Sequence, residues 1–160
     1  MTIAIAPVTV DETPILSAIA DATFTEFHHL RPEETVTQRR EKFVRRAQKR
    51  EGSVQRVFAA RDEKETLIGS LSVVDADLDQ ELYSFWFVSL WVHPEYRGKG
   101  YGRQLLAYGE AYVKNCNISE VFLFTEGLGP WYGQLGWNHL KWSTCSGYPI
   151  EIMSKTLVEL

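Results

Sequence analysis

The chain has 160 residues, of which 44% are hydrophobic, 12% aromatic and 24% charged, the composition of a globular domain rather than of a disordered or fibrous segment. A chain of this length buries roughly 70% of its unfolded surface, so it can fold without a metal or a disulfide. Its net charge of −4 argues against a protein that binds polyanions with its whole surface. We expect one domain over residues 1–160.

Nothing in the sequence indicates export or membrane insertion. Residues 1–10 are apolar, but no Lys or Arg precedes them and Pro7 interrupts them, so we do not expect a signal peptide. No apolar run reaches the ~20 residues that span a bilayer. Cys116 and Cys145 lack the spacing of metal or redox motifs, which favours reduced thiols and a cytoplasmic protein without membrane contact.

In the first half of the chain, apolar periodicity predicts a strand, two helices and a hairpin. The strand covers residues 2–9, and a first helix follows it. Residues 35–51 predict a second helix with a thin apolar seam and charge on its other sides, so we expect this helix to lie on the surface. Residues 54–61 and 66–74 predict an antiparallel hairpin, because a polar tetrad joins two β-rich runs.

Residues 83–92 predict the central strand of the sheet, because both alternating sets of side chains are mostly apolar. We expect the two sets on opposite faces: Trp86, Val88, Leu90 and Val92 against Phe85, Phe87 and Trp91. Residues 102–114 then predict a helix, and residues 121–124 a short apolar strand. A strand, a helix and a strand over this length imply a right-handed parallel crossover.

A short helix at residues 131–135 and a hairpin of residues 137–143 with residues 150–157 complete the chain. The turn of this hairpin contains Gly147 and Pro149. The fold class is therefore α/β of the mixed α+β kind. Its sheet begins antiparallel, has a parallel pair in the middle and ends in a hairpin.

The segment VHPEYRGKGYG, residues 92–102, connects the central strand to the next helix. Alternate glycines let its backbone approach a ligand closely, and the helix start leaves N–H groups unpaired at the positive end of the helix dipole. Flanking basic side chains add charge that a diphosphate would use. The glycines and basic residues are Gly98, Gly100, Gly102, Arg97, Lys99 and Arg103. We interpret the segment as a phosphate-binding loop rather than as a simple turn.

Two other phosphate-binding motifs fit less well. A dinucleotide fold requires GxGxxG directly after the strand, whereas this chain has GxGxG after an insertion of residues 93–97. Glu126, after the next strand, could take the place of the ribose-binding acid, so the dinucleotide interpretation stays an alternative. A P-loop is excluded, because GxxxxGK[ST] does not occur in the sequence.

Two motifs resemble those of the Gcn5-related N-acetyltransferase (GNAT) family. Residues 97–102 match RxxGxG and, with their lead-in, resemble the family's acetyl-CoA loop. WYGQLGW at residues 131–137 resembles the family's FYxxxGF segment after the fifth strand. The expected order of strands and helices is also the family's order. The resemblance implies a twisted, partly antiparallel sheet with a splayed central parallel pair and flanking helices.

The same resemblance implies acetyl-CoA as the cosubstrate. In the family, pantetheine lies in the gap of the parallel pair and bonds to the main chain of the central strand, while loop amides bind the diphosphate. The corresponding strand residues are Leu90, Trp91 and Val92. The corresponding loop residues are Arg97, Gly98, Lys99, Gly100, Tyr101, Gly102 and Arg103.

The implied reaction is direct transfer of an acetyl group from the thioester to a primary amine. The amine, with a pKa of ~10.4, must lose a proton before it attacks, and the departing thiolate, with a pKa of ~8.5 by analogy with cysteine, benefits from a proton donor. Tyr132 lies where the family keeps its tyrosine, so we predict it as the general acid; the alternative is a core aromatic residue. The base stays open, because residues 83–92 contain no carboxylate where some members place a glutamate. Candidates for a base that acts directly or through water are Glu126, Asp75, Asp77 and Glu81.

Phe27, His29 and Glu126 are candidates for the acceptor pocket, since the family's substrate enters near the end of the first helix. Whether the amine belongs to a small molecule or to a protein stays open, as does the choice between a monomer and a homodimer. No histidine pair lies at helical ligand spacing with a carboxylate, so we expect no metal.

A basic run raises a second class of function, a module that binds nucleic acid or another polyanion. Its members are Arg39, Arg40, Lys42, Arg45, Arg46, Lys49 and Arg50. On a helix these charges spread around three sides, and no aromatic residues are interleaved for base stacking, so we do not expect nucleic acid as a partner. An acid-rich protein N-terminus as the acceptor, and a domain that binds acetyl-CoA without turnover, are further alternatives.

Overall fold

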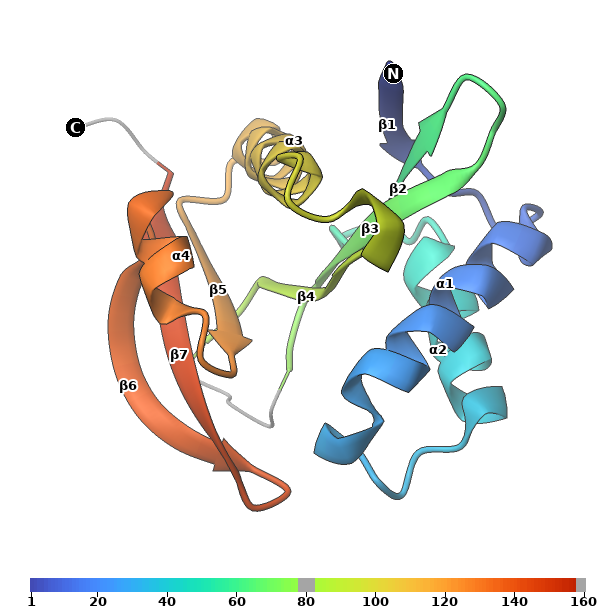
Figure 1. Ribbon diagram of the computed structural model, residues 1–160. Coiled ribbons are helices and arrows are strands. Elements are labelled where there is room, and N and C mark those ends of the chain that lie inside the picture. Colours follow the sequence, from blue (N-terminus) through green and yellow to red (C-terminus); the bar gives the residue numbers. More distant parts are fainter. Residues whose placement is uncertain (78–82, 158–160) are drawn as a thin grey trace.

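The computed structural model describes residues 1–77 and 83–157 and arranges them as one mixed sheet with helices on both faces. The strands lie in the order β1-β2-β3-β4-β5-β7-β6 (Figure 1). They are β1 (Ile3–Pro7), β2 (Arg56–Asp62), β3 (Leu67–Val74), β4 (Trp86–Val92), β5 (Glu120–Thr125), β6 (Asn138–Cys145) and β7 (Tyr148–Thr156). The helices are α1 (Thr13–Phe27), α2 (Val36–Ala47), α3 (Tyr101–Asn115) and α4 (Gly129–Gln134), with 3-10 turns η1 (His28–Leu30) and η2 (Pro94–Tyr96).

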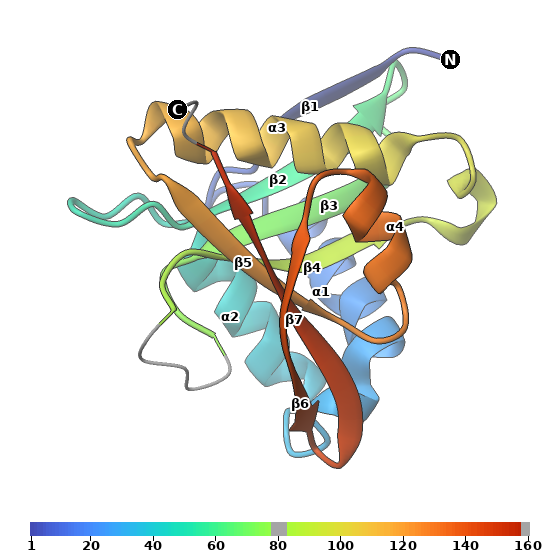
Figure 2. The same ribbon diagram turned by 90° about the vertical axis from the view of Figure 1, so that its left-hand side faces the viewer.

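The strand pairing confirms the expected mixed sheet. β1, β2, β3 and β4 form an antiparallel series, β4 and β5 are parallel, and β7 pairs antiparallel with both β5 and β6. The predicted helices and strands are present, with ends that differ from the prediction by a few residues. The crossover between the parallel strands is α3, which Figure 2 shows running across the strands on one face of the sheet.

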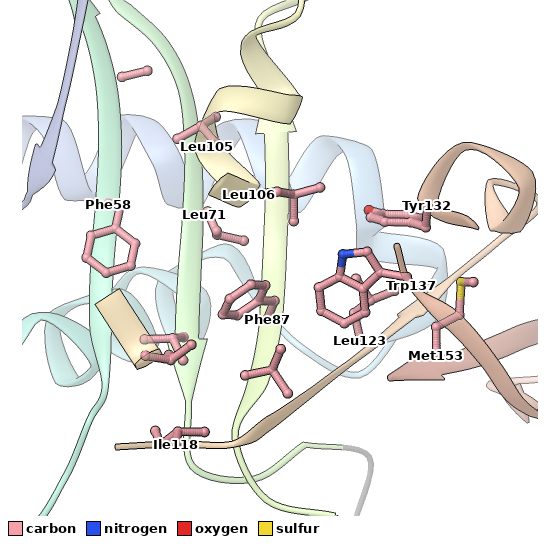
Figure 3. Packing of buried hydrophobic residues seen from close by; sticks show 14 of the residues in the cluster. Phe58, Leu71, Phe87, Leu105, Leu106, Ile118, Leu123, Tyr132, Trp137 and Met153 are labelled. Carbon is pink, nitrogen blue, oxygen red and sulfur yellow. The ribbon is translucent and has the colours of Figure 1, made fainter. Parts of the chain in front are cut away.

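Two hydrophobic layers hold β4 at the centre of the molecule. Helix α3 covers one face of the sheet, whereas α1 and α2 cover the other (Figure 1). Beneath α3, Leu105 and Leu106 pack in one buried cluster with Leu71 and Phe87 (Figure 3). Helix α3 comes close to the sheet because Gly109 has no side chain: a Cβ there would lie 2.7 Å from Leu71 Cδ2. A second buried cluster joins α1 and α2 to β2.

Strand β4 contains a bulge that the sequence pattern did not predict. Ser72 of β3 pairs with Val88, but Ser70 pairs with Trp91, so β4 has one more residue than β3 between these positions. Ser89 lies at this point and has a positive φ of 56°, a conformation that is uncommon for a residue other than glycine. A bulge of this kind bends a strand and changes where its side chains point.

The bulge makes the predicted strict alternation along β4 wrong. Cross-strand partners share a face of the sheet, so Trp91 joins Val88 on the face covered by α1 and α2. Leu90 and Val92 instead pack with Phe87 against the cluster beneath α3. The physical reason is that one inserted residue moves every later side chain to the other face.

Helix α2 buries part of the predicted apolar seam, but it also buries two of its basic side chains. Its first turn is a capping box: Thr35 Oγ1 accepts from the Gln38 amide at 3.1 Å, and Gln38 Oε1 accepts from the Thr35 amide at 2.9 Å. Arg39 and Arg46 are only 5% and 9% exposed. They flank buried Phe43 at spacings of four and three residues, which places all three side chains on one helical face. The expectation of charge only on solvated sides is therefore wrong for these two arginines.

Three further expectations concern the membrane, the cysteines and Glu81. No helix of the described residues is long and apolar enough to cross a membrane. Cys116 and Cys145 are free thiols, in agreement with the sequence. Glu81, one candidate for the base, lies outside the described residues.

Candidate active site

A cavity of about 920 Å³ opens where β4 and β5 separate. The two parallel strands pair at Trp86 and Phe122, whereas β5 is paired with β7 along its whole length. Residues 87–92 of β4 and 123–126 at the end of β5 line the cavity, together with the start of α3 and part of α4. The end of α1 and two arginines of α2 line its other side. Beyond Trp86, the described residues of β4 therefore have no β5 partner, and the cavity lies between the two strands.

The glycine loop supplies a row of amides at one end of this cavity. Gly98 and Gly100 have positive φ values of 79° and 86°, which glycine adopts without steric cost. Gly100 is the N-cap of α3, and its carbonyl accepts the first helical hydrogen bond, from Gln104. Among the described residues, none of the amides from Gly98 to Arg103 donates to a backbone carbonyl. These amides lie at the positive end of the helix dipole, where an anion is stabilised.

The basic side chains of the loop are not equivalent. Arg97 Nε donates to the carbonyl of Val92 at 2.8 Å, and its guanidinium pairs with Glu26 at 3.3 Å, so this side chain braces the loop against β4 and α1. Lys99 does not line the cavity; its Nζ lies 5.7 Å from the centre of the Tyr96 ring. Arg103 lines the cavity. Backbone amides, rather than these side chains, therefore form most of the candidate anion site.

Tyr132 projects from α4 into the same cavity. Its side chain is 7% exposed and makes edge contacts with Trp131 and Trp137, at ring-centroid distances of 4.8 and 6.3 Å. The Trp137 amide donates to the Tyr132 carbonyl at 3.1 Å, which holds the end of the short helix. Burial raises the pKa of the Tyr132 phenol to about 12. The phenol, which Figure 3 shows directed away from α4 toward Leu106, is therefore a protonated donor at neutral pH.

The structure brings together two candidate residues that are 97 positions apart in sequence. His29 Nε2, from η1, lies 2.6 Å from Glu126 Oε1, just beyond β5. The His29 ring also makes an edge contact with Tyr148, at a centroid distance of 4.9 Å. Phe27, His29 and Glu126 all line the cavity. A carboxylate that is hydrogen-bonded to an imidazole can accept a proton from a nearby amine.

The other candidate bases are engaged elsewhere. Asp77 lines the cavity but pairs with Arg31 at 2.6 Å. Asp75 accepts a hydrogen bond from Ser53 Oγ at 3.0 Å and does not line the cavity. Of the described candidates, Asp77 and Glu126 line the cavity, and Glu126 differs in that its partner is a histidine, which can itself carry a proton, rather than an arginine.

The sequence did not identify four charged residues that line the cavity, namely Glu26, Arg31, Arg39 and Arg46. Arg39 and Arg46 line the cavity beside Ser89, and both donate to the Ser89 hydroxyl, at 3.2 and 3.0 Å. The helical spacing of these arginines from the apolar Phe43 and Ala47 could have placed them on the buried face. The density of charge along the helix concealed that signal.

No group of three or more His, Cys, Asp or Glu side chains in residues 1–77 and 83–157 could hold a metal ion. The cavity combines a loop whose amides make no backbone hydrogen bonds, a buried phenol and an imidazole–carboxylate pair. Such a combination can bind a phosphate-bearing ligand, donate a proton to a leaving group and accept a proton from a nucleophile.

Comparison with known proteins agrees with this geometry. A family model described as "Acetyltransferase (GNAT) family" matches residues 16–129. The fold is similar to that of an aminoglycoside 6'-N-acetyltransferase complexed with coenzyme A, with a TM-score of 0.78 and 15% identity over 98% of both chains. No curated protein matches the sequence.

Two further solved structures with a similar fold contain coenzyme A. One is the PaiA N-acetyltransferase from Thermoplasma acidophilum in complex with coenzyme A, with a TM-score of 0.69, 20% identity, and coverage of 98% of this chain and 99% of that one. The other is the spermidine N-acetyltransferase from Vibrio cholerae in complex with CoA and spermine, with a TM-score of 0.69, 15% identity, and coverage of 97% and 95%.

Proposed function

Because the chain belongs to the acetyltransferase (GNAT) family, we propose that it transfers an acetyl group from acetyl-CoA to a primary amine by direct attack on the thioester. The observation that carries the proposal is one continuous cavity. It is lined at one end by the amides of the glycine loop and elsewhere by Tyr132 and the His29–Glu126 pair.

We assign each part of acetyl-CoA to a part of the cavity lining. The unpaired amides from Gly98 to Arg103 suit the diphosphate, because they offer several donors at a helix N-terminus. Leu90, Trp91 and Val92 line the space between the diverging strands, and we assign their main chain to the amide groups of pantetheine. The volume of about 920 Å³ is large enough for an extended ligand together with an acceptor.

The proposed chemistry needs a base that takes a proton from the amine and an acid that gives a proton to the departing thiolate. The amine proton passes to Glu126, directly or through His29, and the nitrogen lone pair attacks the thioester carbonyl. A C–N bond forms and the C–S bond breaks, and the electron pair of the broken bond stays on sulfur. Tyr132 donates a hydrogen bond to this sulfur and then its proton, which gives free CoA. The second proton of the attacking nitrogen is released as the amide forms and returns the Tyr132 phenolate to the phenol. The proton taken up by Glu126 passes to solvent. Burial raises the pKa of a thiol as well as that of the phenol, so protonation of the thiolate is less unfavourable than a comparison of Tyr132, with its pKa of about 12, and a thiol in water indicates.

The rival proposals receive less support from the geometry. A polyanion-binding module would use a solvated basic helix, but two of its arginines are buried in the cavity. A domain that only binds acetyl-CoA would have no use for a buried phenol and an imidazole–carboxylate pair lining the same cavity.

A binding assay and a turnover assay test the proposal. Acetyl-CoA and CoA should each raise the melting temperature, by mass action, and NAD should not. Thiol release from acetyl-CoA should then depend on an added primary amine. If neither CoA species stabilised the protein at millimolar concentration, the proposal would be wrong, and stabilisation by NAD alone would support the dinucleotide alternative.

A further inference from the structure

The part of the cavity next to α2 holds a buried cation without a carboxylate partner. Arg46 is 9% exposed, and no carboxylate of the described residues forms an ion pair with it. Its described hydrogen bonds go from Nη1 to two hydroxyls, Ser89 Oγ at 3.0 Å and Ser72 Oγ at 3.5 Å. Its guanidinium also lies over the Phe43 ring, 4.7 Å from the centroid. A guanidinium carries several N–H donors and no acceptor, so donors of Arg46 are left for a ligand.

The charges around Arg46 leave this end of the cavity positive. Glu34 and Asp77 act on its guanidinium without pairing with it, and both are paired with other cations, so Arg31, Arg39, Lys42 and Arg46 together face two carboxylates. Arg39 reaches the same Ser89 hydroxyl at 3.2 Å and pairs with Glu34 at 3.0 Å, and Glu34 is shared with Lys42. The other carboxylates that line the cavity already have partners. They are Asp77 with Arg31, Glu26 with Arg97 and Glu126 with His29.

A buried charge without a counter-charge is costly, and the cost is removed when a ligand supplies the opposite charge. Two guanidinium groups converge on one hydroxyl, and the planar fork of a guanidinium matches the two oxygens of a carboxylate. The bulge at Ser89 turns that hydroxyl toward both arginines. An acceptor with a negative group therefore suits this end of the cavity better than a purely cationic acceptor such as a polyamine.

We propose that the acceptor is an amine that also carries a carboxylate, and that Arg46 and Arg39 bind this carboxylate beside Ser89. The amine of the acceptor then faces the His29–Glu126 pair within the same cavity. This inference rests on the proposed acetyl transfer and specifies its substrate class. Both a free amino carboxylate and the acid-rich N-terminus of a protein present this chemistry.

Matched acceptors test the proposal on the unmodified protein. The panel pairs each amino acid with its carboxamide and with the amine that lacks the carboxyl group, and it pairs a peptide beginning with three aspartates with its asparagine analogue. We expect kcat/KM for thiol release to be at least about tenfold higher for the carboxylate member of a pair, the usual effect of one charge-assisted hydrogen bond. A larger ratio of kcat/KM values within the amino-acid pairs identifies a small molecule as the source of the carboxylate, and a larger ratio within the peptide pair identifies a peptide.

The variant Arg46→Met tests the residue. It replaces a buried charge with an apolar side chain of similar length, a change that proteins often tolerate. We expect the preference for carboxylate acceptors to fall at least about tenfold through KM, with acetyl-CoA stabilisation unchanged. Arg45→Met is the matched control, because Arg45 is an exposed neighbour outside the main cavity. An N-acetyl amino acid, as a product, should stabilise wild-type protein and Arg45→Met but not Arg46→Met, which is a readout independent of turnover.

The outcomes separate the two proposals. Equal use of carboxylates and carboxamides, a preference for spermidine, or an unchanged preference in Arg46→Met would overturn the carboxylate site while leaving acetyl transfer intact. Absence of any stabilisation by acetyl-CoA would instead overturn the proposed function. If turnover is absent, stabilisation by the N-acetyl amino acid that is lost in Arg46→Met still supports the site, and its absence refutes it.

Discussion

Replacement of Tyr132 by Phe tests the proposed proton donor with little disturbance of the fold. Burial is the one cause of the raised pKa of this phenol, which indicates that its oxygen has no hydrogen-bond partner among the described residues. The ring contacts with Trp131 and Trp137 are retained in a phenylalanine. We therefore expect the free energy of unfolding to change by less than about 1 kcal/mol, because no intramolecular hydrogen bond is lost.

The effect on catalysis should be much larger than the effect on stability. A positioned general acid contributes on the order of a hundredfold or more, so kcat should fall at least about a hundredfold, equivalent to about 2.7 kcal/mol of transition-state stabilisation. Since the pKa of Tyr132 is raised to about 12, the phenol of the wild-type protein stays protonated through mildly alkaline pH. The kcat of the wild-type protein should accordingly show no loss from Tyr132 ionisation up to about pH 10.

The assay is single-turnover thiol release at saturating acetyl-CoA, so that chemistry rather than product release is measured. Thermal stabilisation by acetyl-CoA reports whether the binding site is intact. Tyr108→Phe is the control, because Tyr108 is a partly buried tyrosine of α3 that contacts Phe58 at 5.1 Å and does not line the cavity. Wild-type rates in Tyr132→Phe would refute the role of the phenol, and an equal loss in both variants would show that the effect is structural.

Four other substitutions test the site and the packing around it. Gly100→Ala should raise the KM for acetyl-CoA about tenfold in steady-state assays, because a residue with a side chain is strained at a φ of 86°. Glu126→Gln should lower kcat at least about tenfold without weakening acetyl-CoA binding, since an amide cannot accept the amine proton. Burial raises the pKa of Glu34, but hydrogen bonds from cationic side chains of α2 outweigh this and hold the pKa below its usual value. The stability that Glu34 contributes is therefore present above its unfolded pKa of ~4.3 and is lost as the pH falls through the folded value, so Glu34→Gln should flatten the melting temperature between about pH 5 and 3. Gly109→Ala should lower stability by about 1–3 kcal/mol in denaturant unfolding, because the new methyl group would lie 2.7 Å from a leucine of β3. Gly133→Ala, where an added methyl meets no atom within 4 Å, is its control.

Local patterns in the sequence were sufficient for the order of the elements. The strands and helices were predicted from local periodicity or from short apolar runs, and the glycine loop is recognisable because spacing and charge are properties of neighbouring residues. The parallel pairing of β4 and β5 was also predictable from neighbouring residues, because two strands joined by a helix over this length form a right-handed parallel crossover. These inferences need no knowledge of which distant residues meet.

The features that define the site's chemistry depend on distant contacts. The hydrogen bond between His29 and Glu126 joins residues 97 positions apart. The burial of Arg39 and Arg46 depends on how α2 packs on the sheet. The bulge at Ser89 is visible only when β3 is paired with β4. Sequence alone therefore determined the architecture and the position of the glycine loop. Only the tertiary structure decided which charges meet inside the cavity, because burial and long-range pairing arise from packing and not from local propensity.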